Sequence, residues 1–335
     1  MSVLLRADDL TLGFAVRRGL MDGLRGGGKR VVQALAGVTL TVNRGETLAM
    51  VGESGCGKST LARALVRLLT VDGGQIDYDG QDVRALRGEA LRRYNRRVQM
   101  VFQDPYGSLN PRMTVGETIG EALRVHRMVP AGKIGARVAE LLHLVRLPAG
   151  AADRQPHEFS GGQRQRIAIA RALAVEPELL IADEIVSALD VSVQAQVLNL
   201  LLDMQEELGL AILFVSHDLR VVRHLAHQVA VMYLGRVVEH GPAERVFEAP
   251  LHPYTQALLR AAPTLDRRRH GTESALRGEL PSPLRTPPGC PFHPRCSHAF
   301  DRCRAERPTM RVPSSQGTAG RLAAGHLAAC HLLEC

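Results

Sequence analysis

The stretch "GESGCGKST", from Gly52 to Thr60, decides the fold of this chain. It fits the pattern G-x-x-x-x-G-K-[ST], follows the β-rich run 47–51 and precedes a run with helical spacing. Glycines let backbone N–H groups turn toward phosphate oxygens, and a helix N-terminus adds positive potential. The predicted phosphate-binding residues are Gly52, Ser54, Gly55, Cys56, Gly57, Lys58, Ser59 and Thr60.

The end of this loop carries two side chains that suit a nucleotide. Lys58 would contact the β- and γ-phosphates, and the hydroxyl of Ser59 would ligate Mg²⁺. We expect the side chain of Cys56 to point away from the phosphates, so its thiol receives no chemical role. The loop alone does not separate an ATPase from a GTPase or a kinase.

Two adjacent acids in "LLIADE" (Leu179–Glu184) supply a second group of candidate residues. The four apolar residues predict a buried strand that brings Asp183 to its end, where the carboxylate can hold Mg²⁺ through water. Glu184 follows at once and is a plausible base for an attacking water.

Apolar runs and helical spacings alternate along the chain. "PELLIAD" (177–183) and "LAILFVSHD" (210–218) are continuous apolar runs, which suit strands buried on both faces of a parallel sheet. Leucines at 61, 65, 68 and 69 share one face of a predicted helix, and 114–146 is also helical in pattern. We therefore predict an α/β fold with ligand groups at the strand ends.

A second glycine-rich helix start lies in "FSGGQRQRIAIARAL" (Phe159–Leu173). Ser160, Gly161, Gly162 and Gln163 again combine a small hydroxyl, two glycines and a helix N-terminus, which indicates a second phosphate site. One nucleotide does not need two such sites on one chain. Two chains facing head to tail would each supply one half.

Together these motifs resemble the ABC ATPases, a family of P-loop NTPases, over about residues 1–250. The resemblance implies binding of ATP and Mg²⁺, a helical subdomain at about 104–165, and hydrolysis. It implies that Gln103 senses Mg²⁺ and water, that "SALD" (Ser187–Asp190) crosses to the partner subunit, and that His217 holds the γ-phosphate. Phe14 falls where the family has an aromatic residue that stacks on adenine; a core position is the alternative.

One position departs from the family pattern. The family usually has Asp-Glu-Pro-Thr or Asp-Glu-Pro-Val where this chain has "DEIV". Ile185 replaces a proline, which would fix φ and remove a backbone donor. Because Glu184 is intact we predict hydrolysis, with a less rigid loop.

Two further stretches, "QDPYGSLNPRMTVGETI" (103–119) and "HPYTQALL" (252–259), resemble the ATP-binding subunits of dipeptide and oligopeptide importers. The tail sequence "PSPL…PPGCPFHPRC" adds to this resemblance. It implies two membrane permeases, a second and related ATPase subunit, and an extracytoplasmic substrate-binding protein. Importers of nickel or of another small solute use close relatives, so the substrate stays open.

Composition limits the remaining classes. The chain has 335 residues, enough for about two domains, and no apolar run near the ~18 residues of a membrane helix. Charges at Arg6, Asp8 and Asp9 interrupt any signal peptide, so we expect a peripheral protein on the cytoplasmic face of the cell membrane. The net charge of +8 leaves a nucleic-acid-acting ABC ATPase as an alternative, although no nucleic acid is expected.

Five of the six cysteines lie in the predicted C-terminal extension, residues 251–335, which contains a Pro- and Gly-rich stretch at 262–289 that we interpret as a linker. Cys290, Cys296, Cys303 and Cys330 form C-x5-C-x6-C-x26-C, which is not the usual C-x2-4-C spacing of a zinc site. The resemblance implies a [4Fe–4S] cluster, as in some peptide-importer ATPases. Zinc, no metal at all, and a redox-sensing role remain open, and Cys335 would be spare.

Overall fold

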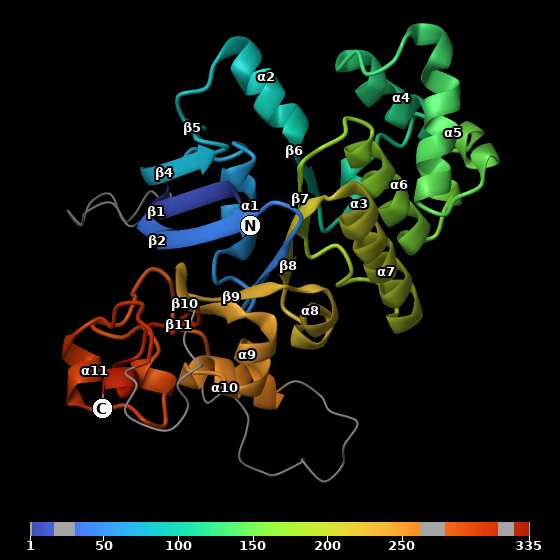
Figure 1. The fold of residues 1–335 in the computed structure, drawn as a ribbon. Helices are drawn as coiled ribbons and strands as arrows, with labels where there is room; N and C mark the ends of the chain where they lie inside the picture. Colours follow the sequence, from blue (N-terminus) through green and yellow to red (C-terminus); the bar gives the residue numbers. More distant parts are fainter. Residues whose placement is uncertain (1, 17–30, 262–278, 314–324, 335) are drawn as a thin grey trace, which may run out of the picture. The chain divides into compact units, whose positions relative to one another are not determined.

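The computed structural model describes residues 2–16, 31–261, 279–313 and 325–334 of the chain (Figure 1). These residues fall into two compact units that interleave along the sequence. The first unit comprises Met1–Leu4, Val42–Thr47 and Asp82–Val215, and the second comprises Leu5–Thr41, Leu48–Gln81 and Ser216–Cys335.

Three parallel strands form the core of the first unit. They stand in the order β8-β7-β6, with bounds Val98–Val101 (β6), Leu179–Asp183 (β7) and Ala211–Ser216 (β8). Every residue of β7 and β8 is buried. The interpretation of the two apolar runs as parallel strands covered on both faces is therefore confirmed.

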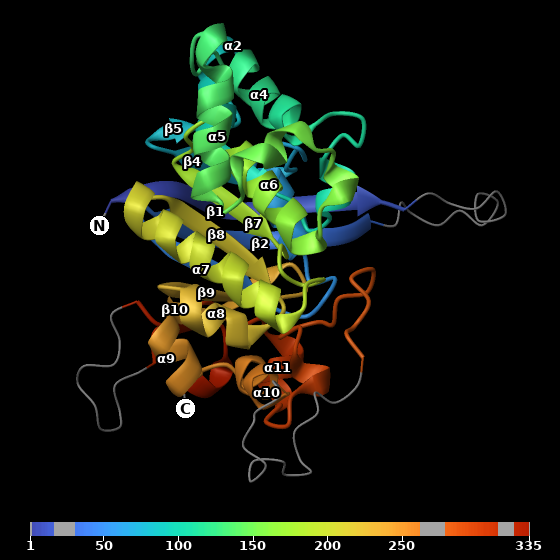
Figure 2. The ribbon, with the colours of Figure 1, turned by 90° about the vertical axis from the view of Figure 1, so that its right-hand side faces the viewer.

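Helices make up most of the rest of this unit, and α4, α5 and α6 contact one another while α6 packs on α7 (Figure 2). Their bounds are Gly88–Arg97 (α2), Pro105–Ser108 (α3), Val115–Val125 (α4), Ile134–Leu144 (α5), Gly161–Leu173 (α6) and Val191–Leu208 (α7). Short 3-10 turns cover Ala131–Lys133, Ala149–Asp153 and Pro156–Glu158.

The region predicted as helical from 114 to 146 contains two helices with a break between them. Thr114 and Glu117 form a capping box that starts α4, because each side chain accepts a hydrogen bond from the other residue's backbone N–H. After α4 the chain reverses at Arg127, whose φ of 52° is left-handed and cannot continue a helix.

Two groups of strands lie in the second unit. One sheet has the order β2-β1-β4-β5, and β1 pairs antiparallel with β4. In the other group, β3 pairs parallel with β9, and β10 pairs antiparallel with β9 and β11. The bounds are Val3–Ala15 (β1), Val31–Asn43 (β2), Thr47–Val51 (β3), Gly73–Tyr78 (β4), Gln81–Asp82 (β5), Gln228–Tyr233 (β9), Arg236–Pro242 (β10) and Leu327–Ala328 (β11).

The helices of the second unit are short. They are Lys58–Leu65 (α1), Leu219–Leu225 (α8), Ala243–Glu248 (α9), Pro253–Ala261 (α10) and Asp301–Ala305 (α11), with 3-10 turns at His293–Arg295 and His331–Glu334. The predicted leucine stripe of the first helix is wrong beyond Leu65, because Arg67 has a φ of 60° and Leu68 is 59% exposed. Part of the predicted linker, 262–278, lies outside the described residues.

A buried carboxylate ties the end of the chain to this unit. Glu239 of β10 is fully buried and accepts hydrogen bonds from the backbone N–H groups of Leu251 and His252. The Nε2 atom of His326 lies 2.8 Å from the same carboxylate. A buried charge needs such partners, so this network fixes the segment that carries β11. Among the described residues, no helix is both long and apolar enough to cross a membrane.

We predict that replacing Gly162 with alanine destabilises the first unit by about 1–3 kcal/mol. A β-carbon there would lie 2.1 Å from Cγ1 of Val193, so α6 and α7 could not keep their present contact. Urea unfolding of the purified chain measures the change. Gly135→Ala is the matched control, since a β-carbon at Gly135 in α5 meets nothing within 4 Å. An equal effect of both substitutions would contradict the packing argument.

Candidate functional site

The predicted phosphate loop lies between the end of β3 and the start of α1, as the sequence motif requires. Gly52 and Gly57 have φ values of 151° and 110°, and Gly57 is the N-cap of α1. A β-carbon at Gly52 would lie 2.2 Å from the carbonyl oxygen of Met232, and one at Gly57 would lie 2.4 Å from that of Ala34. Only glycine fits at these two positions.

The loop's lysine lies inside the turn that the glycines make. Lys58 is 3% exposed, and its Nζ donates to the carbonyl oxygens of Gly52, at 2.9 Å, and of Glu53, at 3.1 Å. Ser54 and Gly55 are exposed, and the space around Gly55 is open. A buried ammonium beside an open glycine turn at a helix start fits a polyphosphate. The thiol of Cys56 is buried, and burial raises its pKa.

The candidate residues of the first unit gather at the carboxyl ends of two neighbouring parallel strands. Val101 ends β6, Asp183 ends β7, and Gln103 follows β6 by two residues. The Nε2 atom of Gln103 lies 3.5 Å from the hydroxyl of Ser187, and that hydroxyl donates to the carbonyl oxygen of Glu184 at 2.9 Å. The structure therefore brings Gln103 together with the segment that follows the paired acids.

The proposed base is held in a backbone conformation that most residues avoid. Glu184 has a φ of 49°, in the left-handed region, which costs about 1 kcal/mol or more for a residue with a β-carbon. Its N–H donates to the carbonyl oxygen of Val215 at 3.0 Å, and the N–H of Ser187 donates to its carbonyl at 3.2 Å. The prediction that Ile185 makes this loop less rigid concerns motion and stays a prediction.

The second predicted phosphate site shows a capped helix. Ser160 is the N-cap of α6, and its Oγ accepts from the N–H of Gln163 at 3.3 Å, while the N–H of Ser160 donates to Oε1 of Gln163 at 3.0 Å. Ser160 and Gly161 are exposed, whereas Gly162 is buried against Val193. A packing contact therefore explains one of the two glycines, and the helix start remains open to a ligand.

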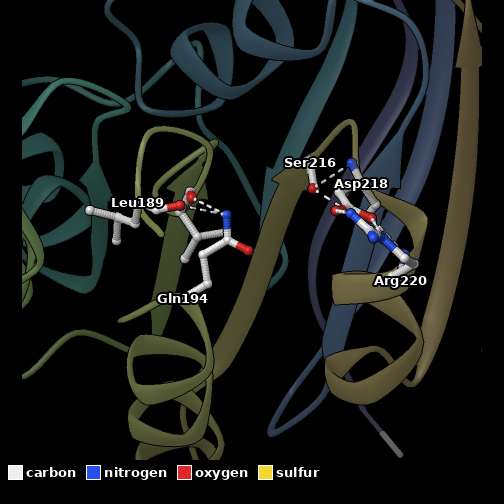
Figure 3. A network of polar contacts seen from close by, with 6 residues as sticks. Leu189, Gln194, Ser216, Asp218 and Arg220 are labelled. Atoms are coloured by element: carbon white, nitrogen blue, oxygen red, sulfur yellow. Dashed lines mark hydrogen bonds and ion pairs between the residues drawn. The ribbon is translucent and has the colours of Figure 1, made fainter. Parts of the chain in front are cut away.

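The "SALD" segment, which the resemblance assigns to the partner contact, is fixed by polar contacts. Nε2 of Gln194 donates to the carbonyl oxygens of Leu189, at 3.0 Å, and Val186, at 2.9 Å (Figure 3). Asp190 caps α7 by accepting from the N–H of Val193. The hydrogen bond from Ser192 lowers the pKa of Asp190, so its carboxylate is charged near neutral pH.

His217 directly follows β8 and is exposed, and its neighbour Asp218 is fixed by several hydrogen bonds. Asp218 accepts hydrogen bonds from the backbone N–H and the guanidinium of Arg220, and its N–H donates to the hydroxyl of Ser216 (Figure 3). The hydrogen bond from Arg220 lowers the pKa of Asp218. Asp218 and Arg220 were missed in the sequence analysis, although an aspartate before an apolar helical run is a capping signal.

Phe14 lies near the end of β1 and is 43% exposed. This exposure does not agree with the alternative of a core position.

The four tail cysteines lie within electrostatic range of one another. Cys290, Cys303 and Cys330 are buried, and Cys296 is half-buried. Burial raises the pKa of Cys330 to about 11, and the three other thiols add to the rise. In the described part of the chain, no three His, Cys, Asp or Glu side chains stand in a metal-ligand arrangement. Cys335 lies outside the described residues.

A glycine-rich loop between a strand and a helix, with paired acids after a buried parallel strand, defines the class of P-loop nucleoside triphosphatases. Known families narrow the class. A family model described as "ABC transporter" matches residues 35–187, and one described as "Oligopeptide/dipeptide transporter, C-terminal region" matches residues 238–303.

Individual relatives agree with both matches. The probable peptide ABC transporter ATP-binding protein y4tS of Sinorhizobium fredii is 55% identical over 86% of this chain and 82% of the relative. The dipeptide transport ATP-binding protein DppF of Escherichia coli is 48% identical over 92% of this chain and 91% of the relative. The chain belongs to the ATP-binding proteins of the ABC transporter family, within the dipeptide and oligopeptide transporter group.

A solved structure confirms the predicted fold class. The ATP-binding cassette MJ0796, in a dimeric post-hydrolysis state with ADP and phosphate, matches with a TM-score of 0.62 and 27% identity. The match covers 72% of this chain and 99% of that one. Both the resemblance to ABC ATPases and the α/β P-loop fold are thus confirmed.

We predict that Gly57→Ala destabilises the second unit more than Gly55→Ala does. Both positions have left-handed φ values, 110° and 79°, which cost an alanine about 1–2 kcal/mol. Only Gly57 adds a backbone clash, at 2.4 Å from the carbonyl oxygen of Ala34. Thermal unfolding without nucleotide measures the difference, and equal melting temperatures would refute the steric account of the loop.

Proposed function

We propose that this chain is the ATP-hydrolysing subunit of a membrane importer of dipeptides or oligopeptides. The observation that carries the proposal is the joint presence of the phosphate loop, with Lys58 in its turn, and the match to the oligopeptide/dipeptide transporter region at 238–303. The relative named as a dipeptide transport protein supports the same substrate class. Import of nickel or of another small solute is not favoured by these relatives, nor is action on nucleic acid.

Binding and hydrolysis would divide among the residues described above. Gly52–Thr60 would bind the phosphates through backbone N–H groups and Lys58, and Phe14 would stack on the base. Ser59, Gln103 and Asp183 would hold Mg²⁺, which neutralises phosphate charge when bound. Glu184 would accept a proton from the attacking water, and His217 would hold the γ-phosphate and orient that water.

The helix start at Ser160–Gln163 would complete the nucleotide site of a second ATPase subunit. The backbone N–H groups at the start of α6 are the donors that such a site needs, and the solved relative MJ0796 is dimeric. Closure of a head-to-tail dimer on ATP would act on two permeases, and hydrolysis would reset them. An extracytoplasmic binding protein would deliver the substrate.

This assignment implies a location and a division of the chain. The subunit would be peripheral, on the cytoplasmic face of the cell membrane, because its partners span that membrane. Residues 1–250 would form the ATPase domain with a helical subdomain at about 104–165, and 251–335 would form the C-terminal extension. The second ATPase subunit would be a related chain.

We predict that Glu184→Gln lowers ATP hydrolysis by about a hundredfold or more, the usual contribution of a general base, while ATP still binds. The amide cannot accept a proton at neutral pH. Phosphate release measures hydrolysis in the purified chain or its transporter, and equilibrium titration measures binding. Glu207→Gln, on the exposed end of α7, is the control. Unchanged hydrolysis in Glu184→Gln would remove this residue as the base.

The function is tested in cells by uptake. Deleting the gene should abolish uptake of a labelled dipeptide, the wild-type gene should restore it, and the Glu184→Gln gene should not. Normal dipeptide uptake in the deletion strain, together with lost uptake of nickel, would replace the proposed substrate class.

We also propose that Cys290, Cys296, Cys303 and Cys330 hold a [4Fe–4S] cluster. Four Cys thiolates are the donor set that such a cluster takes, and the other three cysteines contribute to the raised pKa of Cys330. Burial raises the pKa of the thiols of Cys290, Cys296 and Cys330, so cluster binding would release protons. Because the described residues show no ligand arrangement, binding would also move the thiols.

The expected result for protein purified without oxygen is about four irons and four sulfides per chain, with a brown colour. Changing any one of the four cysteines to serine should remove the colour, whereas Cys56→Ser should not. Zinc without iron would indicate a structural zinc site in place of the proposed cluster. Absence of both metals would end the cofactor proposal and leave the ATPase proposal standing.

A further inference from the structure

The C-terminal region reaches the phosphate loop within the second unit. Arg295, in the 3-10 turn His293–Arg295, donates from both terminal guanidinium nitrogens to the carboxylate of Glu53, at 2.6 and 3.0 Å. Glu53 is the second residue of the loop. The arginine side chain is 4% exposed and that of the glutamate 25%, so this is a largely buried, two-point ion pair.

A second residue of the C-terminal region holds the backbone at the same place. The N–H of Glu53 donates to the hydroxyl of Tyr254 in α10 at 2.9 Å, and Tyr254 is fully buried. The carbonyl oxygen of Glu53 accepts from Lys58. Side chain, N–H and carbonyl of Glu53 are therefore all engaged, two of them by residues of the region at 238–303.

Aromatic packing fixes both of these holding residues. The ring of Tyr254 lies 4.7 Å from that of Tyr233 and 5.4 Å from that of Phe292, between centroids. Phe292 precedes Arg295 by three residues, and its ring also lies 5.4 Å from that of Tyr233. Because all three rings are buried, the guanidinium of Arg295 is presented to Glu53 from a rigid base.

The carboxylate of Glu53 has the same sign of charge as the polyphosphate that its loop is proposed to bind. A carboxylate near a bound polyphosphate repels it, and the repulsion grows as water is excluded. Arg295 supplies the opposite charge at hydrogen-bonding distance, so the pair is neutral. The loop needs only its backbone donors and Lys58 for phosphate, and Arg295 leaves them in place.

We propose that Arg295, with Tyr254, is a positioning residue for nucleotide binding: it acts through Glu53, neutralising its carboxylate and holding the first turn of the phosphate loop. This inference rests on the proposed binding of ATP at Gly52–Thr60. The C-terminal region would then influence the affinity of the chain for ATP without touching the nucleotide itself.

The test measures ATP affinity of the purified full-length chain with Mg²⁺ by equilibrium titration. Arg295→Gln should bind ATP about tenfold more weakly, because the carboxylate of Glu53, no longer neutralised, repels the polyphosphate. Arg295→Lys keeps the charge and should recover most of the loss. The double variant Glu53→Gln/Arg295→Gln should bind within about threefold of wild type, because no carboxylate remains to be neutralised.

A matched control comes from the same region. Arg302 also pairs with carboxylates, those of Glu306 and Glu334, at 43% exposure and without contact to the loop. Arg302→Gln should leave ATP affinity within about twofold of wild type, as expected for an exposed pair. Tyr254→Phe removes only the hydroxyl and should weaken ATP binding about threefold to tenfold. It carries the test if Arg295→Gln does not fold.

The outcomes separate a positioning role from simple docking of the tail. Docking alone predicts that Arg295→Gln lowers the melting temperature with unchanged ATP affinity, or that the double variant binds as weakly as Arg295→Gln. Either result overturns the inference while wild-type ATP binding keeps the proposed function. Wild-type protein that binds no ATP overturns both.

Discussion

The close approach of the phosphate loop to its neighbours constrains the rest of the second unit. Two loop glycines have no room for a β-carbon, one against β9 and the other against β2. The turn between β9 and β10 completes the enclosure, because the N–H of Gly235 donates to the carbonyl of Cys56 and its own carbonyl accepts from Ala36. The shape of the loop is therefore set by strands far away in the sequence, and Lys58 is held inside a turn that already exists.

The C-terminal region adds a second enclosure from the other end of the chain. Glu53 is separated from Tyr254 and Arg295 by 201 and 242 positions, and both contacts are partly buried. A buried ion pair whose partner is removed leaves an uncompensated charge, so such a contact is expensive to break on one side only. The phosphate loop and the region at 238–303 are therefore tightly joined, although they match two different family descriptions.

Local patterns in the sequence predicted much of this arrangement. The phosphate loop and the buried strands depend on neighbouring residues, whose types fix backbone shape or burial. The predicted helix ends were wrong, because Arg67 and Arg127 take left-handed conformations that no residue-type rule indicates. The Glu53–Arg295 pair was missed because either residue alone is typical of a solvated surface, and only the folded chain brings them together. The packing reason for Gly162 likewise depends on Val193, thirty-one positions away.

The one departure from the family pattern has a physical counterpart in the fold. A proline after Glu184 would restrain the loop through its fixed φ. Ile185 is 2% exposed, so its side chain is packed in the interior at the position where the family has proline. Two hydrogen bonds hold Glu184 in its left-handed conformation: its N–H donates to the carbonyl oxygen of Val215, and its own carbonyl oxygen accepts from the N–H of Ser187. The hydroxyl of Ser187 lies 3.5 Å from Nε2 of Gln103 and donates to the carbonyl oxygen of Glu184. This one hydroxyl therefore links the side chain of Gln103 to the backbone of Glu184.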